Sequence, residues 1–218
     1  MVSAVVNEAR EATEITLFTQ DHPGLYSRFA AACAAAGVEI LEAKIFTTRD
    51  GMALDTLWVR DPDVGAITEG RRTDRLEDMI RKVLAGEILP PDVIESRTRR
   101  KPVLEAFNFE PHAYIDNSAS DKYSVIEVNG LDRPGLLHAL TRTLFHLGLT
   151  IASSFVTSYG ERAVDVFYVS DLMGGKITNA AKRRSIERQL LEALANPMKK
   201  SRPRKATAPK SGKKKFVA

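Results

Sequence analysis

Two five-residue segments with the pattern Asp-x-Pro-Gly-Leu carry the groups best suited to chemistry in this chain. They are Asp21-His22-Pro23-Gly24-Leu25 and Asp132-Arg133-Pro134-Gly135-Leu136, called here the first turn and the second turn. Proline suits the first position of a helix, whose N–H needs no partner within the helix. The N–H groups at a helix start favour a carboxylate, and an aspartate can accept a hydrogen bond from an ammonium group. Each turn therefore offers partners for both charges of a free amino acid.

A purely structural interpretation of the same residues stays open. Asp21 and Asp132 could cap the helices that follow them, which would contribute about 1 kcal/mol to stability. Ser153 and Ser154, on a predicted strand of the second half, present a similar choice. They could line a ligand groove, or they could be small polar residues at a sheet edge.

The two turns belong to an internal repeat. With an offset of 111 residues, the first turn falls on the second and Gly37 falls on Gly148. One residue is lost at a hairpin turn, after which Asp55 matches Asp165 with an offset of 110. Insertions and deletions are tolerated in surface turns, so the two copies are predicted to be structural equivalents.

Each copy has the pattern of a strand, a helix, a β-hairpin and a second helix. The predicted strands are 14–20, 38–48 and 52–60 in the first copy and 123–129, 149–158 and 162–170 in the second. Gly37 and Gly148 are predicted to end the first helix of each copy. Apolar residues at helical spacing place the second helices around 76–84 and 186–194.

A fourth strand is predicted for the first copy at 103–115, which gives the order βαββαβ of a ferredoxin-like unit. The second copy has no equally good fourth strand, and residues 216–217 are its only weak candidate. The fold class expected is α+β, with two ferredoxin-like units in tandem and antiparallel sheets covered by helices on one face. The expected boundaries are a leader at 1–13, a first domain at 14–117 with a linker at about 86–105, a second domain at 118–195, and a basic disordered tail at 196–218.

These features resemble a known family. The repeated βαββαβ unit with its Asp-x-Pro-Gly-Leu turn resembles the ACT domain, a small-molecule sensing module of amino-acid metabolism. The segments DHPGLYSRFA, KIFTTRDGMALDTLWV, VIEVNGLDRPGLL and TSYGERAVDVFYVSD resemble the paired C-terminal ACT domains of bacterial PII uridylyltransferase/uridylyl-removing enzymes. The resemblance covers about residues 12–195. It implies that the amino acid bound at the two turns is glutamine, and that the module serves nitrogen regulation.

The resemblance also implies what this chain lacks. Members of that family carry a nucleotidyltransferase domain and an HD phosphohydrolase domain ahead of the ACT pair, whereas here 13 residues precede the first predicted strand. We therefore expect a truncated form without catalytic residues, metal or cofactor, since Mg²⁺ would belong to the missing domains. The alternatives are a stand-alone ACT-repeat protein that binds another amino acid, or one that acts in trans on PII or on a separate catalytic chain. Pairing of sheet edges into a homodimer is a further possibility.

Charge and motif content exclude several other classes. The chain has 32 basic and 28 acidic residues, but nine of the basic residues and no acidic one follow Ala195, so residues 1–195 carry a net charge of −5. A specific nucleic-acid interface is therefore not expected, because the basic charge belongs to the tail. A nucleic-acid binder that acts through this tail is the remaining alternative function. We expect no membrane span and no signal peptide, because no apolar run approaches about 18 residues and residues 1–10 lack a basic start and a long apolar stretch. A single cysteine, Cys33, cannot form an internal disulfide. A cytoplasmic location is expected.

No catalytic constellation stands out. Asp61-Pro62-Asp63 has the spacing of a metal-binding carboxylate pair, but it lacks the Gly-Ser turn of a nucleotidyltransferase. Gly174-Gly175-Lys176 is only part of a phosphate-binding loop. Asp55 and Asp165 lie in the middle of apolar strands, and a buried aspartate needs a partner. We expect that partner to be a cation such as Lys44 or Arg162.

Overall fold

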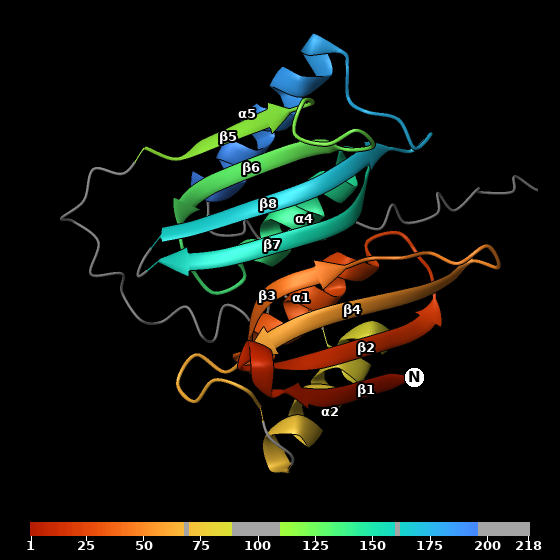
Figure 1. Ribbon diagram of the computed structural model, residues 1–218, viewed down its shortest axis with the longest axis vertical. Helices are drawn as coiled ribbons and strands as arrows, with labels where there is room; N and C mark the ends of the chain where they lie inside the picture. Colours follow the sequence, from red (N-terminus) through yellow and green to blue (C-terminus); the bar gives the residue numbers. More distant parts are fainter. Residues whose placement is uncertain (68–69, 89–109, 160–161, 196–218) are drawn as a thin grey trace, which may run out of the picture.

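Eight strands pair into one continuous antiparallel sheet in the computed structural model, which describes residues 1–67, 70–88, 110–159 and 162–195. The strand order is β1-β2-β4-β3-β7-β8-β6-β5, and it can be followed from bottom to top in Figure 1. The helices lie behind this sheet, where α1 packs on α2 and α4, and α4 packs on α5. The predicted fold class, two ferredoxin-like units with helices on one face, is confirmed.

Apart from one short 3-10 helix in the first half, the two halves contain the same elements in the same order. The first half contains β1 (Val2–Asn7), the short 3-10 helix η1 (Glu8–Arg10), β2 (Ala12–Gln20), α1 (Leu25–Ala36), β3 (Glu39–Lys44), β4 (Met52–Arg60) and α2 (Arg71–Ala85). The second half contains β5 (His112–Asp116), β6 (Ser124–Leu131), α4 (Leu136–His146), β7 (Leu149–Tyr159), β8 (Arg162–Asp171) and α5 (Ala180–Ala195).

The fourth strand of each sheet comes from upstream rather than from downstream. The prediction that 103–115 completes the first sheet is wrong, because β5 pairs with β6 of the second half. The first sheet is completed by β1, which lies in the segment 1–13 that we expected to be a leader. In both cases the edge strand and the next strand form a hairpin, which requires only a short connection. Residues 103–109 and 216–217 lie outside the described residues.

The core lies between the sheet and the helices. Alternate strand residues point to the helix face, where Phe29, Leu57, Ile126, Leu140 and Phe167 are fully buried. Helix α1 is unusual, because its sequence LYSRFAAACAAA supplies mostly small side chains. These small side chains let α1 lie close to both neighbouring helices. The glycines predicted to end α1 and α4 do so, with φ of 79° at Gly37 and 69° at Gly148.

The two halves are joined by a seam made of the β3–β7 pairing and the α1–α4 contact. In the ladder, Ala43 pairs with Ser154, which is its own equivalent at the repeat offset of 111. An approximate two-fold axis therefore passes through this pair. Ser27 and His138 are also equivalents, and the His138 Nδ1 lies 2.7 Å from the Ser27 carbonyl oxygen. Burial lowers the pKa of His138, which favours the neutral imidazole at this position.

A direct hydrogen bond crosses the seam between the helix layer and the sheet. Tyr26 on α1 reaches Ser154 on β7, with 2.5 Å between the two hydroxyl oxygens. Both side chains are buried, so neither hydroxyl can replace this partner with bulk water. This contact fixes the position of α1 relative to the second half of the sheet.

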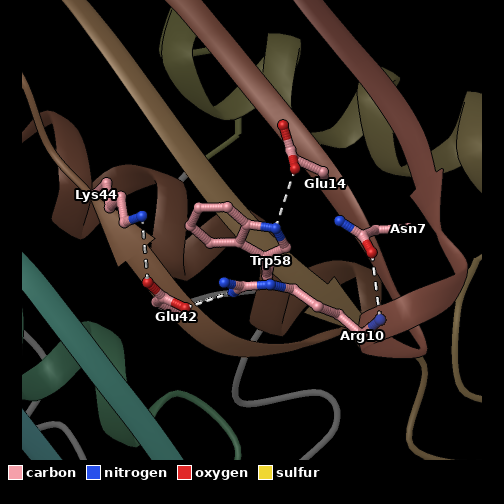
Figure 2. Close-up of polar contacts among 6 residues, drawn as sticks. All are labelled: Asn7, Arg10, Glu14, Glu42, Lys44 and Trp58. Atoms are coloured by element: carbon pink, nitrogen blue, oxygen red, sulfur yellow. Dashed lines mark hydrogen bonds and ion pairs between the residues drawn. The ribbon is translucent and has the colours of Figure 1, made fainter.

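Side-chain contacts connect the N-terminal hairpin, formed by β1, η1 and β2, to the strands near the seam. They lie on the face of the sheet that carries no helices, called here the uncovered face. Figure 2 shows Arg10, from η1, with its guanidinium stacked on Trp58 at 4.4 Å from the ring centroid and paired with Glu42 at 2.6 Å. Asn7 accepts a hydrogen bond from the Arg10 backbone N–H, and Trp58 Nε1 donates to Glu14 at 3.1 Å. These contacts connect η1 directly to β3, the strand that forms the seam.

Replacement of Tyr26 by phenylalanine tests the seam. Tyr26→Phe should lower the free energy of unfolding by about 1–3 kcal/mol, because the Ser154 hydroxyl is left buried without its partner. Urea denaturation followed by circular dichroism measures this change. The double variant Tyr26→Phe/Ser154→Ala should lose less than the sum of the two single losses. Tyr159→Phe, at an exposed tyrosine, is the matched control and should change stability by less than about 0.5 kcal/mol.

Candidate functional site

Each Asp-x-Pro-Gly-Leu turn contains an aspartate that is held by a hydroxyl from the neighbouring hairpin. Thr47 Oγ1 donates to Asp21 at 2.7 Å, and Ser158 Oγ donates to Asp132 at 2.6 Å. Thr47 and Ser158 are equivalents at the repeat offset of 111. The two turns therefore have the same aspartate–hydroxyl pair, which the sequence alignment could have shown but which we did not single out.

The capping interpretation of the two aspartates is contradicted. Gly24 and Gly135 are the N-cap residues of α1 and α4, with no side-chain hydrogen bond to either helix start. Their φ angles of 79° and 77° lie in the left-handed region, which explains the glycine in both turns. The early N–H groups of each helix, which have no partner within a helix, are thus not satisfied by the aspartates.

A cavity of about 620 Å³ lies beside the second turn, where the two halves of the chain meet. The first half contributes the C-terminal part of α1, the start of β3 and the end of β4, and the second half contributes the second turn, the start of α4 and part of β7. Its size is within the range of small-molecule sites, about 300–1,000 Å³. The residues of the second turn, Asp132, Arg133, Pro134, Gly135 and Leu136, all line it.

The cavity brings together polar groups from both halves. Asp132 and Ser158 come from the second half, together with Leu137 and His138 in the first turn of α4. Glu39 and Arg60 come from the first half and form an ion pair at 3.0 Å. The sequence analysis missed Glu39 and Arg60, because nothing in their local sequence shows that β3 and β4 lie against the second turn.

Arg133 lines the cavity but also contacts α5, whereas Ser153 and Ser154 lie away from the cavity. Arg133 donates to the Ala193 carbonyl oxygen at 2.8 Å, near the end of α5. Ser154 is hydrogen-bonded to Tyr26, and Ser153 pairs with Lys44 in the seam ladder. Among the described residues, β7 contributes Val156 and Ser158 to the cavity rather than these two serines.

Asp55 and Asp165 are equivalent carboxyl groups buried beneath the two turns. Burial raises the pKa of Asp165 to about 8 and that of Asp55 to about 7, and Asp132 and Asp21 respectively add to the effect. Asp55 accepts a hydrogen bond from the Phe46 backbone N–H at 3.3 Å, whereas Asp165 Oδ1 has no hydrogen-bond partner.

The expected ion pairs of these two aspartates are not formed. Lys44 lies 3.8 Å from Glu42 and 5.0 Å from the Trp58 ring centroid, and Arg162 donates to Asn129 at 2.7 Å. Side chains alternate between the two faces of a strand, and both cations belong to the face opposite the helices. The two aspartates point to the helix face, where burial raises their pKa and so favours the neutral, protonated carboxyl.

In the ranges that the structure describes, no group of three or more His, Cys, Asp or Glu side chains is placed to hold a metal ion. Of the helices described, none has the length and apolar content needed to cross a bilayer. The basic tail at 196–218 lies outside the described residues.

Comparisons with known proteins agree with the fold. Residues 119–195 match a family model described as the ACR family N-terminal ACT domain. A bifunctional uridylyltransferase/uridylyl-removing enzyme of Nitrobacter hamburgensis is 47% identical over 195 residues, which cover 87% of this chain and 20% of that enzyme. The enzyme of the same name from Rhodopseudomonas palustris is 47% identical over 197 residues (87% of this chain, 21% of the enzyme), and that of Azospirillum brasilense 46% over 198 residues (90% and 21%).

These findings confirm the resemblance to ACT domains of this enzyme family. The chain spans about one fifth of the length of the curated relatives that it matches. The second half is the part matched by the ACT model, and the internal repeat gives the first half the same fold.

The buried aspartates predict how stability depends on pH. Asp165 keeps its proton up to a pKa of about 8 when folded, but ionises near its ordinary pKa of 3.8 when unfolded. The folded state therefore binds more protons between these values, so the contribution of Asp165 to stability is fully present below about pH 4 and is lost as pH rises toward 8. Asp165→Asn removes this group, and should flatten the decline by up to about 1.4 kcal/mol per pH unit.

Urea denaturation at several pH values across this window measures the slope. A residual slope is expected in the variant, because Asp55 still titrates with a raised pKa. Asp121→Asn, at an exposed carboxylate, should keep the parental slope. A variant at Asp165 whose stability declined as steeply as the parent would contradict the assignment.

Proposed function

We propose that this chain is a regulatory module that senses free glutamine, and that it corresponds to the C-terminal ACT pair of the uridylyltransferase/uridylyl-removing enzymes. The observation that carries the proposal is the cavity at the second turn. There a carboxylate, a helix N-terminus and an ion pair from the other half of the chain converge on a space of small-molecule size.

The two charges of the amino acid have distinct partners in this arrangement. The ligand carboxylate is placed at the start of α4, where the N–H groups of Leu137 and His138 and the helix dipole favour an anion. The ligand ammonium is placed against Asp132, whose orientation is fixed by Ser158. A buried or half-buried charge-assisted hydrogen bond of this type is worth about 1.5–3 kcal/mol.

The ligand side chain is placed toward Glu39 and Arg60. A carboxamide can accept from the Arg60 guanidinium through its oxygen and donate to Glu39 through its nitrogen. Glutamate would instead bring a second carboxylate beside Glu39, which repels it and already occupies the Arg60 guanidinium as its ion-pair partner. The pair therefore favours glutamine over glutamate.

The affinity required for sensing is modest. A millimolar Kd corresponds to about −4.1 kcal/mol. Spread over the roughly ten non-hydrogen atoms of glutamine this is about −0.4 kcal/mol per atom, well within the range of small ligands. A half-open cavity with a few charged contacts is sufficient.

Regulation follows from the position of the cavity between the two halves. A ligand changes an activity only if it binds two states of the protein unequally. A ligand held by α4 from one half and by Glu39 and Arg60 from the other favours the state in which the seam is closed. We propose that this closure is transmitted to catalytic domains, in the same or a separate chain, that modify and demodify PII.

Removal of the ammonium partner tests the proposal. Asp132→Asn should weaken glutamine binding by about 10- to 100-fold, because the charge-assisted hydrogen bond is lost. Isothermal titration calorimetry at millimolar glutamine measures the Kd. The fluorescence of Trp58, the single tryptophan, gives a second readout of binding. Trp58 lines a second hollow that shares four residues with the cavity: Leu41, Arg60, Val156 and Ser158.

The control is Asp50→Asn, at an exposed carboxylate of the β3–β4 hairpin, which should leave the Kd unchanged. Absence of any heat with glutamine, for the folded parental chain, would rule out the proposed function.

Replacement of Glu39 tests the selectivity. Glu39→Gln removes the negative charge that opposes a ligand carboxylate, and it should narrow the preference for glutamine over glutamate by about tenfold, near 1.4 kcal/mol. The measurement is the ratio of the two Kd values. Glu14→Gln, at a glutamate on the uncovered face of the sheet, is the matched control and should leave the ratio unchanged.

A further inference from the structure

We infer that the chain binds one amino acid rather than two, because its own Phe145 occupies the first turn. The inference rests on the proposed function, since it concerns the number and place of the same ligand. Two turns of identical pattern suggest two equivalent sites, but their surroundings across the seam differ in size and charge.

The difference lies in the helix that faces each turn. The cavity at the second turn is lined by Ala30, Cys33 and Ala34 of α1. At the repeat offset of 111, the residues that take these places at the first turn are Thr141, Leu144 and Phe145 of α4. Each of the three positions therefore carries a larger side chain at the first turn.

Phe145 reaches the first turn directly. A Cβ atom placed on Gly24 would lie 3.6 Å from Phe145 Cδ1 and 3.7 Å from its Cε1, so the ring is in van der Waals contact with the glycine position. Gly24 is the N-cap of α1, where a ligand carboxylate would have to approach. The side chain is 37% exposed, so most of its surface is covered in this position. The ring thus fills the space that the second turn leaves for a ligand.

The charged pair is also confined to the second turn. The residues equivalent to Glu39 and Arg60 are Thr150 and Ser170, neither of which carries a charge. A ligand at the first turn would contact Asp21 and Thr47. The polar end of its side chain would find no ion pair like that of Glu39 and Arg60. Even an emptied first turn would therefore bind glutamine more weakly and with less selectivity.

Isothermal titration calorimetry of the full chain with glutamine tests this inference, because it measures the number of glutamine molecules bound per chain. The parental chain should bind one glutamine per chain. Phe145→Ala should bind two, the second more weakly, and adding Asp21→Asn to this variant should return the number to one. Ala34→Phe should bind none, because it places a ring beside Gly135 as Phe145 lies beside Gly24.

Folding of each variant is checked by circular dichroism and by thermal unfolding, and Phe145→Leu serves if Phe145→Ala is unstable. Phe155→Ala is the matched control, because this phenylalanine is similarly exposed but lies in β7 on the uncovered face, and it should keep one site.

The outcomes separate the two proposals. A parental stoichiometry of two, a Phe145→Ala or Phe145→Leu variant that stays at one, or an Ala34→Phe variant that still binds would each overturn the inference and leave glutamine sensing intact. A folded parental chain that binds no glutamine would overturn both.

Discussion

The antiparallel pairing of β3 with β7 is the constraint on which the rest of this structure depends. It converts two four-stranded sheets into one, and it brings α1 against α4 on the helix face. Because Ala43 pairs with Ser154, its own equivalent in the repeat, the approximate two-fold axis at this pair relates the two copies of the repeat. Each turn is thereby placed against the other half of the chain, and neither turn could form a two-sided cavity within its own half.

The seam is polar where most protein cores are not. Tyr26, Ser154, Ser27 and His138 exchange hydrogen bonds across it, and two buried aspartates with raised pKa, Asp55 and Asp165, belong to the same sheet. Buried polar groups stabilise only when their partners are in place, so they penalise any other alignment of the two halves. This gives the seam a defined register, which a purely apolar contact would set less strictly.

The repeat made most of the architecture predictable from sequence. It located both turns, both helix-ending glycines and the hairpins, since these follow from local patterns that occur twice. The edge strands were assigned wrongly because β5 has the composition of a strand but no local signal for which sheet it joins. The partners of Asp55 and Asp165 were also wrong, because strand alternation puts Lys44 and Arg162 on the other face. Glu39, Arg60 and Phe145 were not recognised, since their roles appear only when the two halves are aligned across the seam.

The position of the edge strands has a consequence for folding during synthesis. Because β1 precedes β2, the first half has all four of its strands once α2 has been made, and it does not wait for any later segment. Its β3 is then a temporary sheet edge, until β7 is translated more than a hundred residues after it. Such an edge invites pairing with other chains, and charged side chains protect against this. Glu42 and Lys44 supply those charges on β3 before β7 pairs with it. Arg10 adds a third charge, because it stacks on Trp58 and forms an ion pair with Glu42.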